Sequence, residues 1–486
     1  MRICFIDQAD SPVSGVTTYG RWLHRTLPGV QVLQLGSEGP DFAERGRRLP
    51  ATETHRPEGI AAFLRDWIGN DCEQDWLLLP NCGQTAHEAC RLLLLDPPKD
   101  RELRVLGYAH SDDANTGLLL EHYQEIFSGV VAVSDHLQRR LKGLLNGTAG
   151  VRLHCLPYPQ APLAVASETN REPDQPLRLI YAGRLEETQK RLSRLVDVLE
   201  FLDEAGMPFQ LDLLGAGPAE TPLRNQLSRW TQGTHPSVRF LGACPPDAVP
   251  AHLARADVLL LTSAYEGNPL VLAEGMAARL CPVVMAIDSG VGELIRHGES
   301  GFLTPQGDVA AMARVLEHLH RDRELLEGVK DRARSVALAE RCPERHREAF
   351  ETFAEACFTW PQPTGLAPEL PSPQETALRR LLSGPSCNRL ESPTVIFGAG
   401  VFGRSLADRC RETGVRVEGF VDSDPRQQGN TIDGLPVQGP ESLLTDTPRC
   451  ILLGSMGFCA DMRSQIQRLY RSHAQELPRI VGLDRV

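Results

Sequence analysis

Residues 256–287 read ADVLLLTSAYEGNPLVLAEGMAARLCPVVMAI. Two apolar runs, 256–263 and 281–287, enclose a helical stretch that begins near Pro269, and this strand–helix–strand pattern is typical of a parallel α/β sheet. Glu266 and Glu274 stand on either side of the helix start. Pro269 suits a first helical turn and Glu266 suits the positive end of the helix dipole, but neither effect requires Glu274. The two carboxylates therefore have to be interpreted together with the rest of the chain.

The same alternation of short apolar runs and amphipathic helices extends through most of the 486 residues. Further strands are predicted at 2–7, 75–80, 104–110, 129–134, 177–183, 209–217 and 237–243, and a charged helix at 343–360. The stretches 161–176 and 361–374 collect Pro and polar residues, so we expect them to separate domains. The sequence thus predicts an α/β protein with domains at 1–165, 166–360 and 392–486, and a Pro-rich linker at 361–391.

Composition limits the classes of partner and compartment. The formal net charge of -12 argues against nucleic acid, which needs clustered Lys and Arg. Arg45, Arg47 and Arg48 form a small basic group, which is interpreted as a solvated loop and leaves room for weak membrane contact. No apolar run reaches the ~20 residues that span a bilayer. The N-terminus has no secretory signal and the 13 cysteines are scattered, so we expect a cytoplasmic protein and no structural metal.

Several predicted strands of the second domain end in residues that suit a phosphate or a close approach of backbone. Arg184 and Lys190 follow the strand at 177–183, where two cations suit a diphosphate. Gly215 and Gly290 stand in Gly-rich turns after two other strands. Each feature alone has an ordinary explanation, a solvated surface pair or a tight βα turn.

Taken together, these features point to one ligand site. Ligands of open α/β sheets bind outside the carboxyl ends of the strands. The helix that starts near Pro269 would direct free N–H groups at an anion. Glu274, one turn into that helix, could reach diol hydroxyls, while Glu266 would lie at the loop tip nearer a sugar. We therefore expect the two carboxylates to bracket a nucleotide-sugar.

With these motifs in the same order, residues 1 to about 360 resemble a retaining GT-B glycosyltransferase of family 4. The resemblance rests on GRL…K (183–190), EGNPLVLAEGMA (266–277) and SGVGELI (289–295). It implies two Rossmann-like domains that face each other across a cleft. The second would hold the nucleotide and the first mainly the acceptor. Small departures, Ser14-Gly15 in place of paired glycines and Gly275 in place of alanine, concern the sugar pocket and not the class.

The resemblance also implies a role for each motif residue. Arg184 and Lys190 would neutralise the diphosphate leaving group, and Glu274 would bind the ribose. Glu266 and the backbone of Asn268, Pro269 and Leu270 would contact the transferred sugar. In the first domain, Gly15 matches a loop that approaches donor and acceptor, and His110 matches a strand-end histidine near the sugar.

The chemistry expected of such a site is electrostatic. Charge develops on the diphosphate as its bond to the anomeric carbon breaks, and fixed cations aimed there are an effective catalyst. No carboxylate is placed as a nucleophile, and no metal is expected to be required. The expected donor is a UDP-sugar and the acceptor a glycan, a lipid-linked group or a protein, with homo-oligomers left open.

Residues 394–425 form a third motif, strand, Gly398-x-Gly400-x-x-Gly403, helix, strand and Asp422, which is the dinucleotide fingerprint in its βαβ context. The segment 429–444 resembles the small nucleotide-sugar-binding domain of sugar acyltransferases. Three readings stay open: a nucleotide-sugar site, an NAD-dependent sugar oxidoreductase, or a non-catalytic assembly module whose glycines only permit a tight turn. The D-x-D string Asp422–Asp424 lies outside the transferase site and is not expected to hold a catalytic metal.

Overall fold

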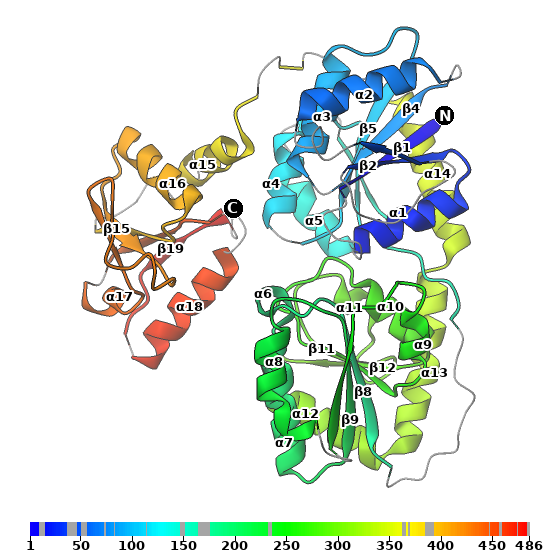
Figure 1. Cartoon of the computed structure of the whole chain (residues 1–486), viewed down its shortest axis with the longest axis vertical. Helices are drawn as coiled ribbons and strands as arrows, with labels where there is room; N and C mark the ends of the chain where they lie inside the picture. Colours follow the sequence, from blue (N-terminus) through cyan, green and yellow to red (C-terminus); the bar gives the residue numbers. More distant parts are fainter. Residues whose placement is uncertain are drawn as a thin grey trace. The chain divides into compact units, whose positions relative to one another are not determined.

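The computed structural model describes residues 1–8, 15–35, 46–49, 56–71, 74–81, 83–112, 114–145, 151–163, 175–231, 236–361, 366–367, 370–383, 393–446, 448–455, 459–473 and 475–483. The chain divides into two compact units (Figure 1). Unit 1 comprises Met1–Asp112 and Tyr123–Leu366, and unit 2 comprises Asp113–His122 and Ala367–Val486. Unit 1 contains two parallel sheets and unit 2 contains a third sheet.

The first sheet of unit 1 has the strand order β3-β2-β1-β4-β5-β6-β7, and its described pairs are parallel. Its strands are β1 (Arg2–Gln8), β2 (Val30–Leu35), β3 (Gly46–Leu49), β4 (Trp76–Pro80), β5 (Leu103–Ala109), β6 (Gly129–Ala132) and β7 (Arg152–Cys155). Its helices are α1 (Gly15–Thr26), α2 (Pro57–Gly69), α3 (Gln84–Leu95), η1 (Gln124–Ile126) and α5 (Asp135–Leu144). The central strands are buried on both faces, because helices cover a parallel sheet on both sides.

The second sheet of unit 1 has the order β10-β9-β8-β11-β12-β13. Its strands are β8 (Leu177–Ala182), β9 (Phe209–Leu214), β10 (Ser237–Gly242), β11 (Val258–Leu261), β12 (Cys281–Met285) and β13 (Phe302–Thr304). Its helices are α6 (Glu187–Lys190), α7 (Leu192–Glu204), α8 (Glu220–Gln226), η2 (Ser228–Trp230), α9 (Val249–Leu253), α10 (Leu270–Ala277), α11 (Val291–Leu294), α12 (Val309–Arg321), α13 (Arg323–Glu340) and α14 (Pro343–Thr359).

Alternating side chains along the strands of this sheet pack into two separate hydrophobic cores, one on each face. Leu179 and Leu260 face α7 and α12, whereas Ile180 and Leu259 face α10 and α13. Figure 1 shows these helices on opposite sides of the sheet. Both faces are apolar for this reason, and the strands read as continuous hydrophobic runs.

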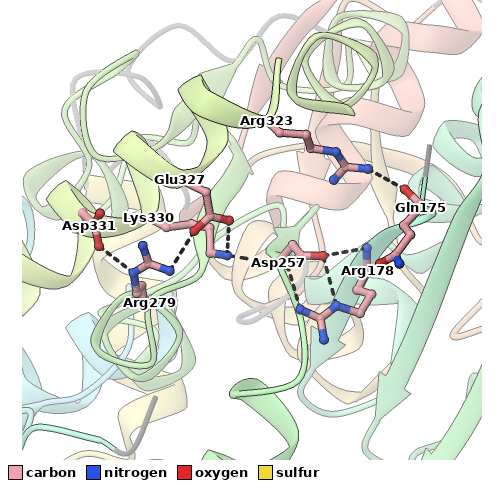
Figure 2. A network of polar contacts seen from close by, with 8 residues as sticks. All are labelled: Gln175, Arg178, Asp257, Arg279, Arg323, Glu327, Lys330 and Asp331. Atoms are coloured by element: carbon pink, nitrogen blue, oxygen red, sulfur yellow. Dashed lines mark hydrogen bonds and ion pairs between the residues drawn. The ribbon is translucent and has the colours of Figure 1, made fainter. Parts of the chain in front are cut away.

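A network of charges supports the second sheet at the amino ends of β8 and β11 (Figure 2). Asp257 is buried, and its carboxylate receives the Arg178 guanidinium at 2.8 Å, while Lys330 Nζ lies 3.6 Å away. Glu327 joins Lys330 to Arg279, and Arg279 also pairs with Asp331 of α13. These pairs attach α13 to the edge of the sheet opposite the strand ends that carry the predicted site.

The last helix of unit 1 returns to the first sheet. α14 follows α13, and its Phe353 stacks on His154 of β7 with ring centroids 4.8 Å apart. The neighbouring Arg104 of β5 donates a hydrogen bond to the Trp360 carbonyl at 3.0 Å. Gly129 leaves room for the Phe353 ring, since a Cβ there would lie 2.9 Å from Phe353 Cζ. α14 thereby ties the two sheets of unit 1 together.

Unit 2 has a mixed sheet in the order β16-β17-β15-β14-β18-β19, with β16 and β17 antiparallel. Its strands are β14 (Thr394–Phe397), β15 (Val417–Val421), β16 (Thr431–Ile432), β17 (Leu435–Gln438), β18 (Cys450–Leu453) and β19 (Arg479–Val481). Its helices are α4 (Ala114–His122), α15 (Pro373–Ser383), α16 (Val401–Glu412), α17 (Ser442–Thr445) and α18 (Cys459–Ser472).

The predicted fold class is confirmed: two Rossmann-like α/β domains with parallel sheets, and a third, smaller sheet. Several strands were not predicted, among them β2 and β13. The stretch 361–391, predicted as a linker, contains α15, whose Leu378 and Leu381 are buried in the core of unit 2. Helix α4, whose residues were predicted as part of the first domain, packs in that same core through Leu118.

Candidate functional site

Lys190 and Glu266, predicted from separate motifs, are joined directly. Lys190 ends the short helix α6 after β8, and its Nζ lies 2.6 Å from Glu266 Oε1 in the loop after β11. Ser263 Oγ donates to the same oxygen at 2.6 Å, and Gln189 Nε2 donates to Oε2 at 3.3 Å. Both charged side chains are largely buried. This buried pair forms because β8 and β11 are neighbours whose carboxyl ends share one edge.

Arg184 lies in the same loop as α6 but is exposed. Its carbonyl accepts from the Tyr181 hydroxyl at 2.8 Å, which holds the backbone, while its guanidinium donates to Gln189 Oε1 at 3.3 Å. Only that longer bond to a neutral partner holds the guanidinium among the described contacts. The loop therefore offers a cation that is available to an anionic ligand.

Glu274 is placed in the first turns of α10, which starts at Leu270 after the N-cap residue Pro269. Its side chain is half-buried and has no hydrogen-bond partner among the described residues. Burial raises the pKa of the Glu274 carboxyl to about 7. Its neighbour Gly275 packs against Leu259, since a Cβ there would lie 2.8 Å from Leu259 Cδ2, so glycine replaces the expected alanine for a packing reason.

The predicted glycines of the site play unequal parts. Gly215 has φ +142°, and a Cβ on it would collide with the Gly183 backbone, so it lets the loops after β8 and β9 pack together. Gly15 begins α1, and a Cβ on it would lie 3.4 Å from Leu270 Cδ1. Gly15 and Leu270 are therefore neighbours across the two domains of unit 1, and Gly290 likewise faces the first domain.

His110 follows β5, and both of its ring nitrogens are engaged. Asn81 uses its amide NH₂ on the carbonyls of Leu79 and Ile6, so its oxygen accepts from His110 Nε2 at 2.7 Å. That assignment makes Nδ1 the acceptor of the Tyr158 hydroxyl at 2.5 Å. Burial lowers the pKa of His110 to about 3, so the ring is neutral.

The sequence did not predict that Asn81 and Tyr158 contact His110. It also did not predict that Asn268 has a hydrogen-bond partner in the first domain. Asn81 directly follows β4, so the rule that ligands gather at strand ends could have singled it out. Tyr158 lies in an irregular segment and carries no local signal. Asn268 was expected to contact the sugar through its backbone; its side chain donates to the Val133 carbonyl at 2.6 Å.

In unit 2 the glycine motif is largely used for packing. A Cβ on Gly403 would collide with the Gly398 carbonyl, and Gly398 itself has φ +110°. Gly400 differs, because a Cβ on it would meet no described atom within 4 Å. The Asp422 carboxylate accepts from the backbone N–H of Ala399 at 2.7 Å and of Asp424 at 2.8 Å, so it braces the glycine loop.

No group of three or more His, Cys, Asp or Glu side chains among the described residues is placed to hold a metal ion. Among the helices that the structure describes, none is long and apolar enough to cross a membrane.

The site lies in a segment with known relatives. Residues 165–336 match the family model described as Glycosyl transferases group 1. We call this matched segment the group 1 domain. This group 1 domain carries Arg184, Lys190, Glu266 and Glu274.

Two curated relatives are each similar to part of this chain. A Salmonella typhimurium protein provisionally named as the colanic acid biosynthesis glycosyltransferase WcaL is 32% identical over 258 residues, which is 49% of this chain and 61% of that protein. The amylovoran biosynthesis glycosyltransferase AmsK of Erwinia amylovora is 34% identical over 151 residues, 30% of this chain and 36% of that protein. The chain thus spans less than two thirds of the length of either relative.

Solved structures share the fold of about three quarters of the chain. HepE of Anabaena, solved in complex with UDP, superimposes with a TM-score of 0.55 at 17% identity, over 73% of this chain and 100% of that one. The sucrose-phosphate synthase of Thermosynechococcus elongatus gives a TM-score of 0.60 at 16% identity, over 74% and 99%. At such identities the likeness concerns the fold alone, and it confirms the predicted GT-B architecture.

Proposed function

We propose that this chain is a retaining glycosyltransferase that moves a sugar from a nucleotide-diphosphate sugar, expected to be UDP-linked, to an acceptor in glycan or glycoconjugate assembly. The observation that carries the proposal is the Lys190–Glu266 pair, which lies at the carboxyl ends of β8 and β11 inside the group 1 domain. Retention and assignment to family 4 rest on the sequence motifs.

The two cations would receive the diphosphate. Arg184 is exposed and bound only to a neutral amide among the described contacts, so its guanidinium can turn to a phosphate. Lys190 is held at 2.6 Å from Glu266, which fixes its ammonium at the loop. As the bond to the anomeric carbon breaks, both charges stabilise the departing diphosphate, and such preorganised donors need no reorganisation. With two cations and the start of α10 available, the reaction needs no metal.

Glu274 would bind the ribose. Its carboxylate is half-buried without a described partner, and leaving such a group unpaired is costly unless a ligand completes it. The hydroxyls of a ribose are donors that suit it. Glu266 is bound by Lys190, Ser263 and Gln189, so it would present the transferred sugar with a fixed oxygen.

The acceptor class is taken from the relatives. The names of both curated relatives refer to the biosynthesis of bacterial polysaccharides, colanic acid and amylovoran. We therefore extend the proposal to a polysaccharide-building acceptor, in the cytoplasm, where the UDP-sugar would be met. The proposal requires one donor substrate, a UDP-sugar, and no metal ion bound with it.

The glycine motif of unit 2 supports a second candidate activity. Gly400 leaves open space at the start of α16, which a nucleotide pyrophosphate could fill. The Asp422 carboxylate is bound to backbone N–H groups, which disfavours a ribose contact for a nucleotide-sugar and for NAD alike. We rank a nucleotide-sugar site and an assembly module above an NAD-dependent oxidoreductase because the segment 429–444 resembles a nucleotide-sugar-binding domain.

Calorimetric titration with UDP tests the donor site. Glu274→Ala should weaken UDP binding strongly. Glu266→Ala affects the diphosphate only through its contact with Lys190, so it should weaken UDP binding less and should reduce the turnover of UDP-sugars. Asp331→Asn, in the charge network at the opposite edge of the sheet, serves as a control. Equal loss of UDP affinity in the two glutamate variants would contradict the proposed roles.

A further inference from the structure

Two loops of the group 1 domain touch the first domain more closely than any side chain would permit. They follow β11 and β12, and their contact residues are Gly267, Asn268, Gly290 and Glu293, here called the closure residues. Gly267 and Gly290 are both buried. Their partners are the ends of β5 and β6 and the start of α5 in the first domain.

The glycines are required by the neighbouring domain and not by the turn. Gly290 has φ −64°, which any residue adopts. A Cβ on Gly290 would nevertheless lie 2.6 Å from Ser134 Cβ and 2.7 Å from the Gly267 carbonyl oxygen. A Cβ on Gly267 would lie 2.9 Å from Ser111 Cα, and closer still to the His110 carbonyl oxygen. At Gly267 the obstacles are backbone atoms of the first domain, so a methyl group there must push the two domains apart. At Gly290 the obstacle in the first domain is the Ser134 side chain, and the Gly267 carbonyl blocks the way back into its own domain, so a methyl group there presses on Ser134 and on the loop that holds Gly267.

The other two closure residues form hydrogen bonds across the same boundary. Glu293 accepts from the backbone N–H of Asp135 at 3.0 Å and of His136 at 2.7 Å. These amides belong to the first turn of α5, where a helix supplies no acceptor of its own and its dipole favours a carboxylate. Asn268 donates to the Val133 carbonyl at 2.6 Å, directly before that turn.

We propose that the closure residues set the width of the cleft between the domains of unit 1. Gly267 and Gly290 allow the loops to close fully, and Glu293 latches the closed form by capping α5 from the other domain. Gly290 and Asn268 then act on the reaction as positioning residues, because the same loops carry Glu266 and α10 toward His110 and Gly15. The link to catalysis rests on the proposed function; the latch itself does not.

Amide hydrogen exchange of the full-length chain tests this. Glu293→Ala should speed exchange at Asp135 and His136 by tenfold or more, since it removes their acceptor. Gly290→Ala and Gly267→Ala should speed the same two amides although Glu293 is still present. Gly292→Ala is the matched control: it lies two residues from Gly290 in the same loop, where a Cβ meets no described atom within 4 Å, and its exchange should equal that of the wild type.

Protection of the β8 and β11 amides from exchange verifies that each variant is folded. If a glycine variant fails to fold, Asn268→Ala tests the same contact between the domains by removing its hydrogen bond to the Val133 carbonyl. Wild-type exchange at Asp135 and His136 in the folded Gly290→Ala and Gly267→Ala variants would overturn the proposal. Equal acceleration in Gly292→Ala would overturn it too, because space would then not be the cause. The same exchange series measured with UDP separates this proposal from the proposed function. If UDP leaves amide exchange in the wild type unchanged, the proposed donor site is contradicted. The differences in exchange among the variants still test whether Glu293 holds the two domains together.

Discussion

The ammonium of Lys190 and the carboxylate of Glu266 meet at 2.6 Å although 76 residues separate them in the chain. Each side chain is mostly shielded from water, and the two loops are further joined where the Thr262 hydroxyl donates to the Lys190 carbonyl at 2.9 Å. The pair therefore does two things. It places a cation at the strand ends, and it neutralises a buried carboxylate.

Lys190→Ala and Arg184→Ala should lower turnover by similar factors, but only Lys190→Ala should lower the free energy of unfolding. Each removes a charge that faces the diphosphate, so each should lower kcat by on the order of 100-fold. Lys190→Ala also leaves Glu266 buried without its cation, at a cost of about 1–3 kcal/mol in the free energy of unfolding. Because Arg184 is exposed, Arg184→Ala should leave the free energy of unfolding almost unchanged. Denaturant unfolding measures the stability of each variant, and UDP-sugar assays measure its turnover. Near-normal turnover in either variant would contradict the proposed role of the two cations at the diphosphate.

The pH dependence of Glu274 gives a second prediction. Its pKa in the folded chain is about 7, above the ordinary value of 4.5, because burial disfavours the charged form. The folded state thus holds this proton more tightly than the unfolded state, and stability contributed by the protonated form is present below pH 4.5 and lost as the pH rises through about 7. Glu274→Gln should remove that loss, which thermal melts across this window would show.

UDP binding should change in the opposite sense with pH. The ionised Glu274 carboxylate is the better acceptor for ribose hydroxyls, so UDP affinity should rise between about pH 6 and about pH 8. In Glu274→Gln the rise should disappear, apart from any titration of UDP itself. Calorimetry of both proteins at the two pH values decides this, and a slope that persists unchanged in the variant would remove Glu274 from the ribose site.

The sequence predicted those parts of the site that a single sheet determines. Lys190 and Glu266 come from different motifs, yet the carboxyl ends of parallel strands share an edge, so their proximity follows from strand prediction alone. The contacts of Glu293 and Gly267 could not be predicted in this way. They depend on how the two sheets of unit 1 pack against each other, and the hydrophobic pattern of one segment carries no information about its partner in the other sheet.

The stretch 361–391 shows a different limit. Its proline content suggested a linker, but Pro373 stands at the start of α15, where proline is tolerated, and Ala377, Leu378 and Leu381 then line one face. This helical signal was present in the sequence and was outweighed by composition. The partner of that face, Leu118, lies more than 250 residues earlier and carries no such signal.

Helix α4 provides the fourth prediction. Leu118 is 7% exposed and packs in the core of unit 2, and His122 Nδ1 lies 2.9 Å from the Thr376 hydroxyl. Leu118→Ala should therefore destabilise unit 2 by about 2–3 kcal/mol through the cavity it leaves. Asn115→Ala, on the exposed part of the same helix, should be close to neutral. Amide exchange in α15 measures the effect; equal protection in both variants would show that α4 does not support it.

The last prediction uses two glycines, three residues apart, to distinguish the three proposed roles of unit 2. Gly403→Ala should unfold unit 2 locally, because the new Cβ collides with the Gly398 carbonyl. Gly400→Ala should fold normally, since Gly400 has φ −72° and open space beside it. If a nucleotide-sugar places its pyrophosphate at the start of α16, the methyl group fills that space and should weaken binding by tenfold or more. The measurement is a calorimetric titration of the full chain with UDP-glucose in a Glu274→Ala background, which weakens the donor site. A second binding event lost in Gly400→Ala supports the nucleotide-sugar site; its absence in both proteins supports an assembly module, and binding of NAD in its place would favour the oxidoreductase.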